Sequence, residues 1–325
     1  MKRRGFIALL GGAAAWPLAA RAQDSPPVIG YLGSRSEQSD APFVASFRRG
    51  LAESGGSVDK RAAIEFRWGS NEPDRLDRLA AELIAMGPAA ILASGGSATA
   101  LVLKKLTNKI PIVFVNGADP VKVGLVRSIN RPEANLTGVN FLATQIVAKR
   151  LELLLAFVPK AKLVAAIVNS SNPDFASMAR DFEGAQHKFQ IQFKTFRASS
   201  IAEIDAAFAD MEGRRPDALL IGGDAYFNGV RRHLITRCTR LSLPAIFDVR
   251  EFAAEGGLMS YGTSQTDAHR HAGLYVGRIL RGAAPGDLPV LQSTRFELVI
   301  NVATAKAFGI AVPDKLIALA DEVID

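Results

Sequence analysis

The chain has one cysteine and, after its first residues, no long apolar run. Cys238 is the only cysteine among 325 residues, which excludes an internal disulfide and a cysteine-based zinc cluster. It lies in a helical pattern, and we expect it to be a small buried core residue. After residue 22 no apolar run approaches the 18 residues that a membrane-spanning helix needs. The sequence predicts a soluble mature protein that does not insert into a membrane.

The chain also lacks the clustered basic residues that nucleic-acid-binding proteins use. Its formal net charge is +7, but four of the positive residues lie within residues 1–22, which contain no acidic residue. The remaining 35 Lys and Arg residues nearly balance the 32 Asp and Glu residues. No basic run is interleaved with aromatic residues, and no nucleic-acid-binding motif is present. We expect no nucleic-acid partner.

Residues 1–22 have the three parts of an export signal. They begin with a basic segment that includes Arg3-Arg4, continue with an apolar stretch over residues 6–20, and end in a small-residue motif at Ala22. The pattern predicts an exported protein whose signal is cleaved after Ala22. The arginine pair is similar to that of twin-arginine signals.

From residue 28 onward, short β-branched runs alternate with helical patterns of 10–15 residues. This alternation indicates βαβ units and therefore an α/β fold of doubly wound parallel sheets, covered by helices on both faces. The expected strands cover residues 28–32, 63–68, 89–94, 110–115, 163–168, 191–196, 218–221 and 245–247.

Two segments of the chain recur in the same order further along. Residues 88–96 (PAAILASGG) resemble residues 216–223 (PDALLIGG), and residues 111–114 (PIVF) resemble residues 244–247 (PAIF). This repeat predicts two similar α/β lobes.

The lobes are expected to share several crossing segments rather than one linker. Strand-to-helix transitions fall at residues 135–145, 256–268 and 293–305, and crossings that bend together make a multi-strand hinge. The expected first lobe comprises residues 23–140 and about 264–290, and the second comprises residues 141–263 and about 291–325.

Candidate ligand contacts follow from the sheet architecture, because ligands of parallel α/β sheets bind beyond the carboxyl ends of the strands. The residues at these ends offer hydroxyls, amides, carboxylates and aromatic rings, which suit a small polar ligand with one apolar portion. Residues 33–36 and Asp248 also follow strands. The selected candidates are Ser34, Gly96, Ser97, Asn116, Asp119, Asn169, Asp224, Tyr226 and Tyr261.

The two repeated glycine turns differ in the residue that follows. Ser97 could cap the next helix and leave its N–H groups free for an anion, whereas Asp224 offers a carboxylate to a cation. If the two face each other, the site suits a zwitterion such as an amino acid. The alternative is that each residue only caps its own helix.

An enzymatic alternative rests on residues 95–99, which approach the nucleophile-elbow motif G-x-S-x-G with Thr99 in place of the last glycine. A serine esterase would use Ser97 and a histidine. His269 and His271 lie in an expected helix, and we place them on a solvated face. No phosphate-binding P-loop motif is present. We expect no cofactor and no metal.

Five stretches, spread in order along the chain from residue 3 to residue 310, carry a family resemblance: RRGFIALLGGAAAWPLAARAQ, PIVFVNGADPVKVGLVRSINRPEANLTGVNF, KRLELL, REFAAEGGLMSYGTSQTDAHRHAGLYVGRILRGAAPGDLPV and FELVINVATAKAFGI. They resemble ABC-transporter substrate-binding proteins of the type I periplasmic class, in the branch that includes tryptophan and phenylalanine binders. The chain departs from the family where Ala225, rather than a proline, follows Asp224. It departs again at residues 131–138 (RPEANLTG), where Gly-Gly usually precedes the asparagine.

The resemblance implies a two-lobed "Venus flytrap" protein that closes on a solute in the periplasm and performs no chemistry. Its partners would be the solute and the membrane permease subunits, with the ATPase acting indirectly. A ligand-sensing module for a membrane receptor is the alternative within the same fold. Carried over by position, the ligand contacts would be Ser34, Gly96, Ser97, Asp119, Asn169, Asp224 and Tyr226.

Overall fold

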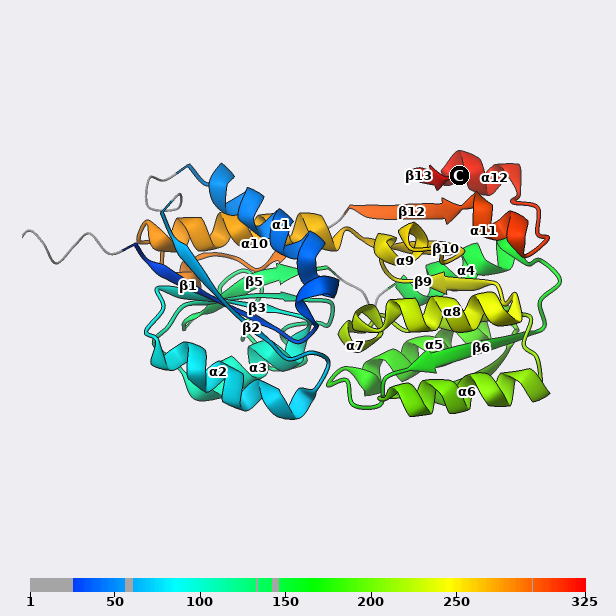
Figure 1. The fold of residues 1–325 in the computed structure, drawn as a ribbon, viewed down its shortest axis with the longest axis horizontal. Helices are drawn as coiled ribbons and strands as arrows, with labels where there is room; N and C mark the ends of the chain where they lie inside the picture. Colours follow the sequence, from blue (N-terminus) through cyan, green and yellow to red (C-terminus); the bar gives the residue numbers. More distant parts are fainter. Residues whose placement is uncertain (1–25, 56–60, 133, 142–145, 294) are drawn as a thin grey trace, which may run out of the picture.

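The computed structural model describes residues 26–55, 61–132, 134–141, 146–293 and 295–325. These residues form two α/β lobes that lie side by side along the long axis of the molecule (Figure 1). The expected export signal lies outside the described residues.

The first lobe is built on a six-stranded sheet in the order β11-β5-β4-β3-β1-β2, and all its paired strands are parallel. Helices α1 (Glu37–Glu53) and α10 (Gln265–Leu280) cover one face, and α2 (Leu76–Ala85) and α3 (Ser97–Leu106) cover the other (Figure 1). The strands are β1 (Val28–Gly33), β2 (Ala63–Trp68), β3 (Ala90–Ser94), β4 (Ile112–Asn116), β5 (Leu136–Asn140) and β11 (Leu291–Gln292).

The second lobe has a seven-stranded sheet in the order β13-β12-β10-β9-β8-β6-β7, in which only the β10–β12 pair is antiparallel. The strands are β6 (Leu163–Val168), β7 (Gln192–Arg197), β8 (Ala218–Ile221), β9 (Ala245–Phe247), β10 (Met259–Thr263), β12 (Phe296–Asn301) and β13 (Glu322–Ile324). One face carries α4 (Val147–Phe157), α5 (Phe175–Phe189), α11 (Val302–Ala307) and α12 (Asp314–Leu319). The other carries α6 (Ile201–Gly213), α7 (Ala225–Gly229), α8 (Arg231–Leu241) and α9 (Arg250–Ala254).

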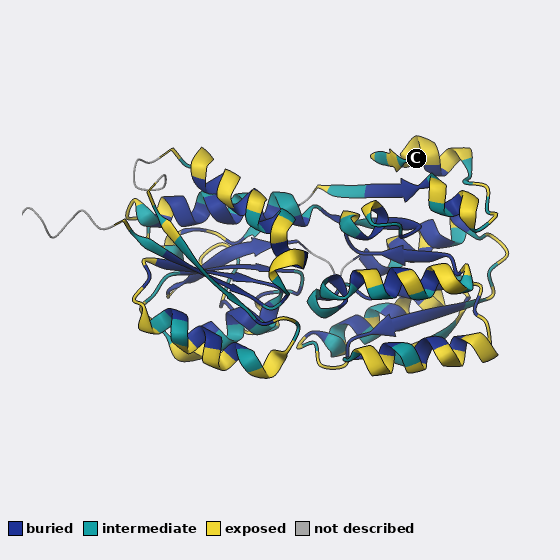
Figure 2. Cartoon of the chain, viewed as in Figure 1, coloured by how far each residue is buried: buried dark blue, intermediate teal, exposed yellow. Residues whose placement is uncertain are grey.

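Each lobe has apolar clusters on both faces of its sheet, as a doubly covered parallel sheet requires. Every residue of β3 and β4 is buried, and Figure 2 shows burial concentrated in the strands and on the inner faces of the helices. Serine side chains cap helices at their N-termini, including Ser36 before α1 and Ser264 before α10. These two helices approach so closely that a Cβ on Gly50 would lie 1.8 Å from the Arg270 carbonyl oxygen.

The strand order confirms the expected pair of doubly wound lobes. The repeated segments occupy matching places in the two sheets, β3 with β8 and β4 with β9. When the strands of each lobe are numbered from its own first strand, five strands of each sheet have the order 2-1-3-4-5. These are β2-β1-β3-β4-β5 in the first lobe and β7-β6-β8-β9-β10 in the second. This is the doubly wound arrangement of flavodoxin-like folds.

The chain passes between the lobes after β5, after β10 and after β11. Thr263 donates a hydrogen bond from Oγ1 to the Phe141 carbonyl oxygen at 2.6 Å, which ties two of these crossings together. The first sheet continues through Leu291 and Gln292 before the last crossing. No helix among the described residues has the length and apolar character needed to span a bilayer.

Candidate ligand-binding cleft

Two adjoining hollows lie between the lobes, at the carboxyl ends of the strands. The hinge-side hollow, of about 490 Å³, is lined by Phe141 and Gln265 near the crossings and by residues of both lobes. The rim-side hollow, of about 680 Å³, lies next to it. These volumes include space that is open to solvent. The hollows share Gly95, Gly96, Ser97, Asn172, Asp224 and Ala225.

The glycine turn after β3 brings the start of α3 into both hollows. Gly96 has φ +92° and ψ −171°, a conformation open to glycine and strained for other residues. Gly96 occupies the N-cap position and Ser97 is the first helical residue, so Ser97 is not the cap. Within the described ranges no side chain caps this helix start, and its backbone N–H groups remain available to an anionic group.

Asn116 supports Ser97 from behind. Its Nδ2 donates to Ser97 Oγ at 3.2 Å and to the Ala118 carbonyl oxygen at 3.1 Å. Asn116 is fully buried and lines neither hollow. The structure therefore places it behind the lining rather than in it.

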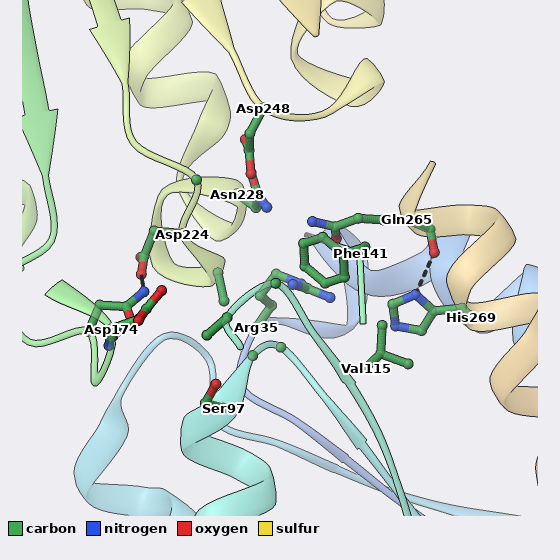
Figure 3. A pocket seen from close by; sticks show the side chains of 17 residues that line it. Arg35, Ser97, Val115, Phe141, Asp174, Asp224, Asn228, Asp248, Gln265 and His269 are labelled. Atoms are coloured by element: carbon green, nitrogen blue, oxygen red, sulfur yellow. Dashed lines mark hydrogen bonds between the residues drawn. The ribbon is translucent and has the colours of Figure 1, made fainter. Parts of the chain in front are cut away.

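Arg35 lines the hinge-side hollow from the end of β1 and is only 2% exposed (Figure 3). Its Nε donates to Asp40 Oδ1 at 2.5 Å, its Nη2 donates to Ser94 Oγ at 3.3 Å, and its guanidinium lies over the ring of Phe43. Asp40 is fully buried and also accepts a hydrogen bond from the Tyr31 hydroxyl at 2.8 Å. The sequence placed Arg35 after a strand, but nothing in it indicated the pairing with Asp40.

His269 corrects the expectation of a solvated histidine face. It is buried, stacks on Phe43 with ring centroids 4.9 Å apart, and lines the hinge-side hollow. Burial lowers the pKa of His269 to about 4, so the ring is neutral near pH 7. The expectation was wrong because residue 269 lies on the face of α10 that packs against the first sheet, with Ala268 and Ala272. His271 is partly exposed, 3.4 Å from Asp267.

Asp224 lines both hollows from the second lobe and also caps α7. Its Oδ1 accepts hydrogen bonds from the Tyr226 and Phe227 amides and from Asn169 Nδ2 at 2.8, 3.3 and 2.9 Å. Its Oδ2 accepts one from Asn172 Nδ2 at 2.5 Å. The side chain of Asp224 therefore caps α7 and also lines both hollows.

Asp248, at the end of β9, lines the hinge-side hollow together with the carboxylate residues Asp174 and Asp224 (Figure 3). Burial raises its pKa to about 6, an effect that the nearby positive charge of Arg150 partly offsets. Arg150 is fully buried and donates from Nε to the Tyr261 carbonyl oxygen at 2.7 Å. In the described part of the chain, Asp248 Oδ1 and both Nη atoms of Arg150 have no hydrogen-bond partner. The sequence showed Asp248 after a strand but gave no reason to select it.

The remaining candidates divide between the rim-side hollow and places outside the lining. Ser34, Asn169 and Tyr226 line the rim-side hollow, where Ser34 Oγ donates to the Gly95 carbonyl oxygen at 3.0 Å. Asp119 lines neither hollow, and its Oδ1 accepts hydrogen bonds from two backbone amides of its own turn. Tyr261 also lines neither, and its ring stacks on Phe296.

In the described part of the chain, Ser97 has no base as a hydrogen-bond partner. Its hydroxyl oxygen accepts a hydrogen bond from Asn116, while both ring nitrogens of His269 are engaged by Gln265 and Ser94. Among the described residues, no group of three or more His, Cys, Asp or Glu side chains could hold a metal ion.

The sequence model of the family described as "ABC transporter substrate binding protein" matches residues 36–324. A "Tyrosine-binding protein" of Clostridioides difficile (strain R20291) is 24% identical over 261 residues, which cover 80% of this chain and 74% of that protein.

Two solved structures share the fold. One is an ABC domain from Streptococcus pneumonia in complex with L-Trp (25% identity, TM-score 0.83, 92% of this chain and 100% of that one). The other is the ligand-free, open structure of a substrate binding protein with adhesive properties from Clostridium difficile (21% identity, TM-score 0.66, 92% and 99%). With this architecture and a family match over nearly its whole length, the chain belongs to the ABC transporter substrate binding proteins and has the type I periplasmic binding-protein fold.

Proposed function

We propose that the protein is the solute-binding component of an ABC importer and that its cleft binds an aromatic amino acid as a zwitterion. The observation that carries the proposal is the opposite polarity of the two sides of the hinge-side hollow. The first lobe contributes donors, Arg35 and the uncapped start of α3, whereas the second contributes the carboxylates of Asp224 and Asp248. A zwitterion placed between them has its carboxylate toward the first lobe and its ammonium group toward the second.

The ammonium group has a suitable acceptor in Asp248. Its Oδ1 is buried without a partner in the described part of the chain, whereas Asp224 already accepts four hydrogen bonds. An unpartnered buried carboxylate oxygen costs desolvation free energy that an ammonium donor would offset. Asp224 adds negative charge on the same side of the hollow.

The rim-side hollow suits the apolar part of the ligand. Its lining includes the apolar side chains of Pro73, Leu76 and Pro173 and the ring of Tyr226, which is half-buried. An aromatic ring can stack on Tyr226 and exclude water from this surface. The relatives support the same ligand class, because one is a tyrosine-binding protein and another was solved with L-Trp.

The cellular setting follows from the family and the N-terminal sequence. We propose that residues 1–22 direct export, that the protein acts in the periplasm, and that its closed, liganded form docks on the permease. The proposal includes no chemical change of the ligand, which fits the absence of a base at Ser97 among the described residues. Labelling of Ser97 by a fluorophosphonate probe would contradict this part.

A thermal-shift screen tests the ligand class. We expect at least one of L-tryptophan, L-tyrosine and L-phenylalanine to raise the melting temperature, because a ligand that binds only the folded state stabilises it. Glucose, xylitol and adenosine serve as neutral polar controls. Stabilisation by these controls alone would refute the proposal.

A further inference from the structure

The guanidinium of Arg35 has donors that its protein partners do not use. Of its five N–H groups, the Nε one binds Asp40 and one on Nη2 binds Ser94. Among the hydrogen bonds of the described residues, none is made by Nη1. The side chain is nearly fully buried and lines the hinge-side hollow (Figure 3). A buried cation with spare donors thus faces the space where a ligand would lie.

The groups behind Arg35 hold it in one orientation. Asp40 Oδ1 lies 2.5 Å from Nε, Asp40 Oδ2 accepts the Tyr31 hydroxyl at 2.8 Å, and Phe43 packs against the guanidinium plane. Taking such a pair out of water costs desolvation free energy, and proteins in which apolar residues replace a buried ion pair are often as stable. A contribution to stability therefore explains the presence of this ion pair poorly. The need to hold an N–H donor toward the hollow explains it directly.

Hydrogen bonds connect Tyr31, Arg35, Asp40, Ser94 and His269 into one buried cluster. Within this cluster, only Arg35 has side-chain N–H groups without an acceptor among the described residues. His269 Nδ1 lies 2.7 Å from the Gln265 carbonyl oxygen, which only accepts, so Nδ1 carries the proton of the neutral ring. Nε2 then carries no proton, and the one proton of the Ser94 hydroxyl has two acceptors within reach, His269 Nε2 at 3.0 Å and Asp40 Oδ2 at 3.1 Å. The hydroxyl oxygen accepts from Arg35, so Ser94 has no donor left for a ligand. The proton of the Tyr31 hydroxyl is used on Asp40.

We propose that Arg35 binds the carboxylate of the ligand through its Nη atoms, with Asp40 as the positioning residue behind it. Two parallel N–H···O bonds from a guanidinium match the geometry of a carboxylate. This inference rests on the proposed function and narrows it, because the site then requires a carboxylate and rejects the corresponding amines. The start of α3 contributes to the same end of the ligand without deciding its identity.

Titration calorimetry with matched ligands tests this role. The wild type, Arg35→Lys, Arg35→Met and the control Arg49→Met are titrated with L-tryptophan, L-tyrosine and L-phenylalanine, with the amines tryptamine, tyramine and phenethylamine, and with indole-3-acetate and phenylacetate. Arg49 is exposed on α1, and among the described residues it donates a hydrogen bond to Ser46 alone. We expect Arg35→Met to weaken amino acid binding about 10- to 100-fold, to leave the weak binding of the amines unchanged, and Arg35→Lys to restore part of the loss.

A further variant guards against misfolding. Arg35→Met leaves Asp40 buried without its cation, so Arg35→Met/Asp40→Leu removes both charges and should fold with the same loss of carboxylate selectivity. Equal amino acid affinity in the wild type and in this double variant would overturn the inference. So would an equal proportional loss for amino acids and amines, because that pattern indicates general damage to the cleft.

The two proposals fail in different ways. If aromatic amino acids bind without any dependence on Arg35, the inference fails and the proposed function stands. If only indole-3-acetate or phenylacetate binds, and Arg35→Met abolishes it, the inference stands and the amino acid assignment fails. If no carboxylate in the panel binds the wild type, both are overturned.

Discussion

Arg231 of the second lobe donates a hydrogen bond from Nη1 to the carbonyl oxygen of Ser39 in the first lobe, at 3.4 Å. The lobes also meet at the glycine turn, where a Cβ on Gly96 would lie 3.6 Å from the Cβ of Ala225. Both contacts join the two lobes across the cleft, so a separation of the lobes would break them. We expect them to favour a closed state that a ligand would select.

Arg231→Met should therefore weaken ligand binding by favouring the open state. Loss of one long cross-lobe hydrogen bond should cost about 1 kcal/mol, or roughly fivefold in affinity. Arg232→Met is the matched control, because Arg232 pairs with the same Glu255 but is exposed. Calorimetry measures the affinities, and equal affinities for the two variants would show that the Arg231 contact does not stabilise closure.

Asp224→Ala should reduce both stability and affinity. The variant loses the α7 cap and leaves Asn169 and Asn172 without an acceptor, at a cost of about 2 kcal/mol in the free energy of unfolding. Binding of an ammonium-bearing ligand should weaken by about 1.5–3 kcal/mol. Ser200→Ala, which removes the α6 cap, should cost about 1 kcal/mol of stability and leave binding unchanged. Unchanged affinity in Asp224→Ala would remove Asp224 from the site.

Two buried groups should give stability opposite dependences on pH. The folded pKa of His269 is about 4, below its unfolded value of about 6.5, so its contribution to stability is lost as pH falls from 6.5 to 4. The folded pKa of Asp248 is about 6, above its unfolded value of about 3.9, so stability is gained as pH falls from 6 to about 4. Each effect amounts to about 2–3 kcal/mol over its window.

Urea unfolding at pH 7 and pH 4.5 separates these two effects. Relative to the wild type, His269→Gln should gain about 2 kcal/mol on acidification and Asp248→Asn should lose a similar amount. If the difference in the free energy of unfolding between variant and wild type is the same at both pH values for both variants, burial does not shift the pKa of either residue as described.

Gly96→Ala should destabilise the protein through its backbone. With φ at +92° and ψ at −171°, an alanine at this turn is strained by about 1–3 kcal/mol. Gly184→Ala is the control, because Gly184 lies inside α5 with nothing within 4 Å of an added Cβ. That substitution should stabilise by about 0.5–1 kcal/mol. Thermal unfolding of both variants checks the prediction, which fails if their melting temperatures shift in the same direction relative to the wild type.

The strands and lobes were predictable because buried parallel strands are short apolar runs. Strands β2, β6, β8 and β9 have the bounds expected from the sequence. The repeat of β3-Gly-Gly in β8-Gly-Gly also predicted the matching positions of the two turns in their sheets. These features depend on local sequence, so no knowledge of distant contacts was needed.

The cluster around Arg35 could not be predicted in the same way. Ser94 and Asp40 are 54 residues apart, and Ser94 and His269 are 175 residues apart. Their meeting depends on the return of the chain from the second lobe to place α10 against α1. The same return explains why His269 is buried. Asp248 was visible after a strand, but its unpartnered oxygen depends on the packing around it.

The most direct test of the proposed function combines calorimetry with small-angle scattering on the purified protein. We predict one-to-one binding of L-tryptophan, L-tyrosine or L-phenylalanine, with a smaller radius of gyration in the liganded state because the lobes close. Binding and compaction with sugars, polyols or nucleosides but with none of these amino acids would contradict the account.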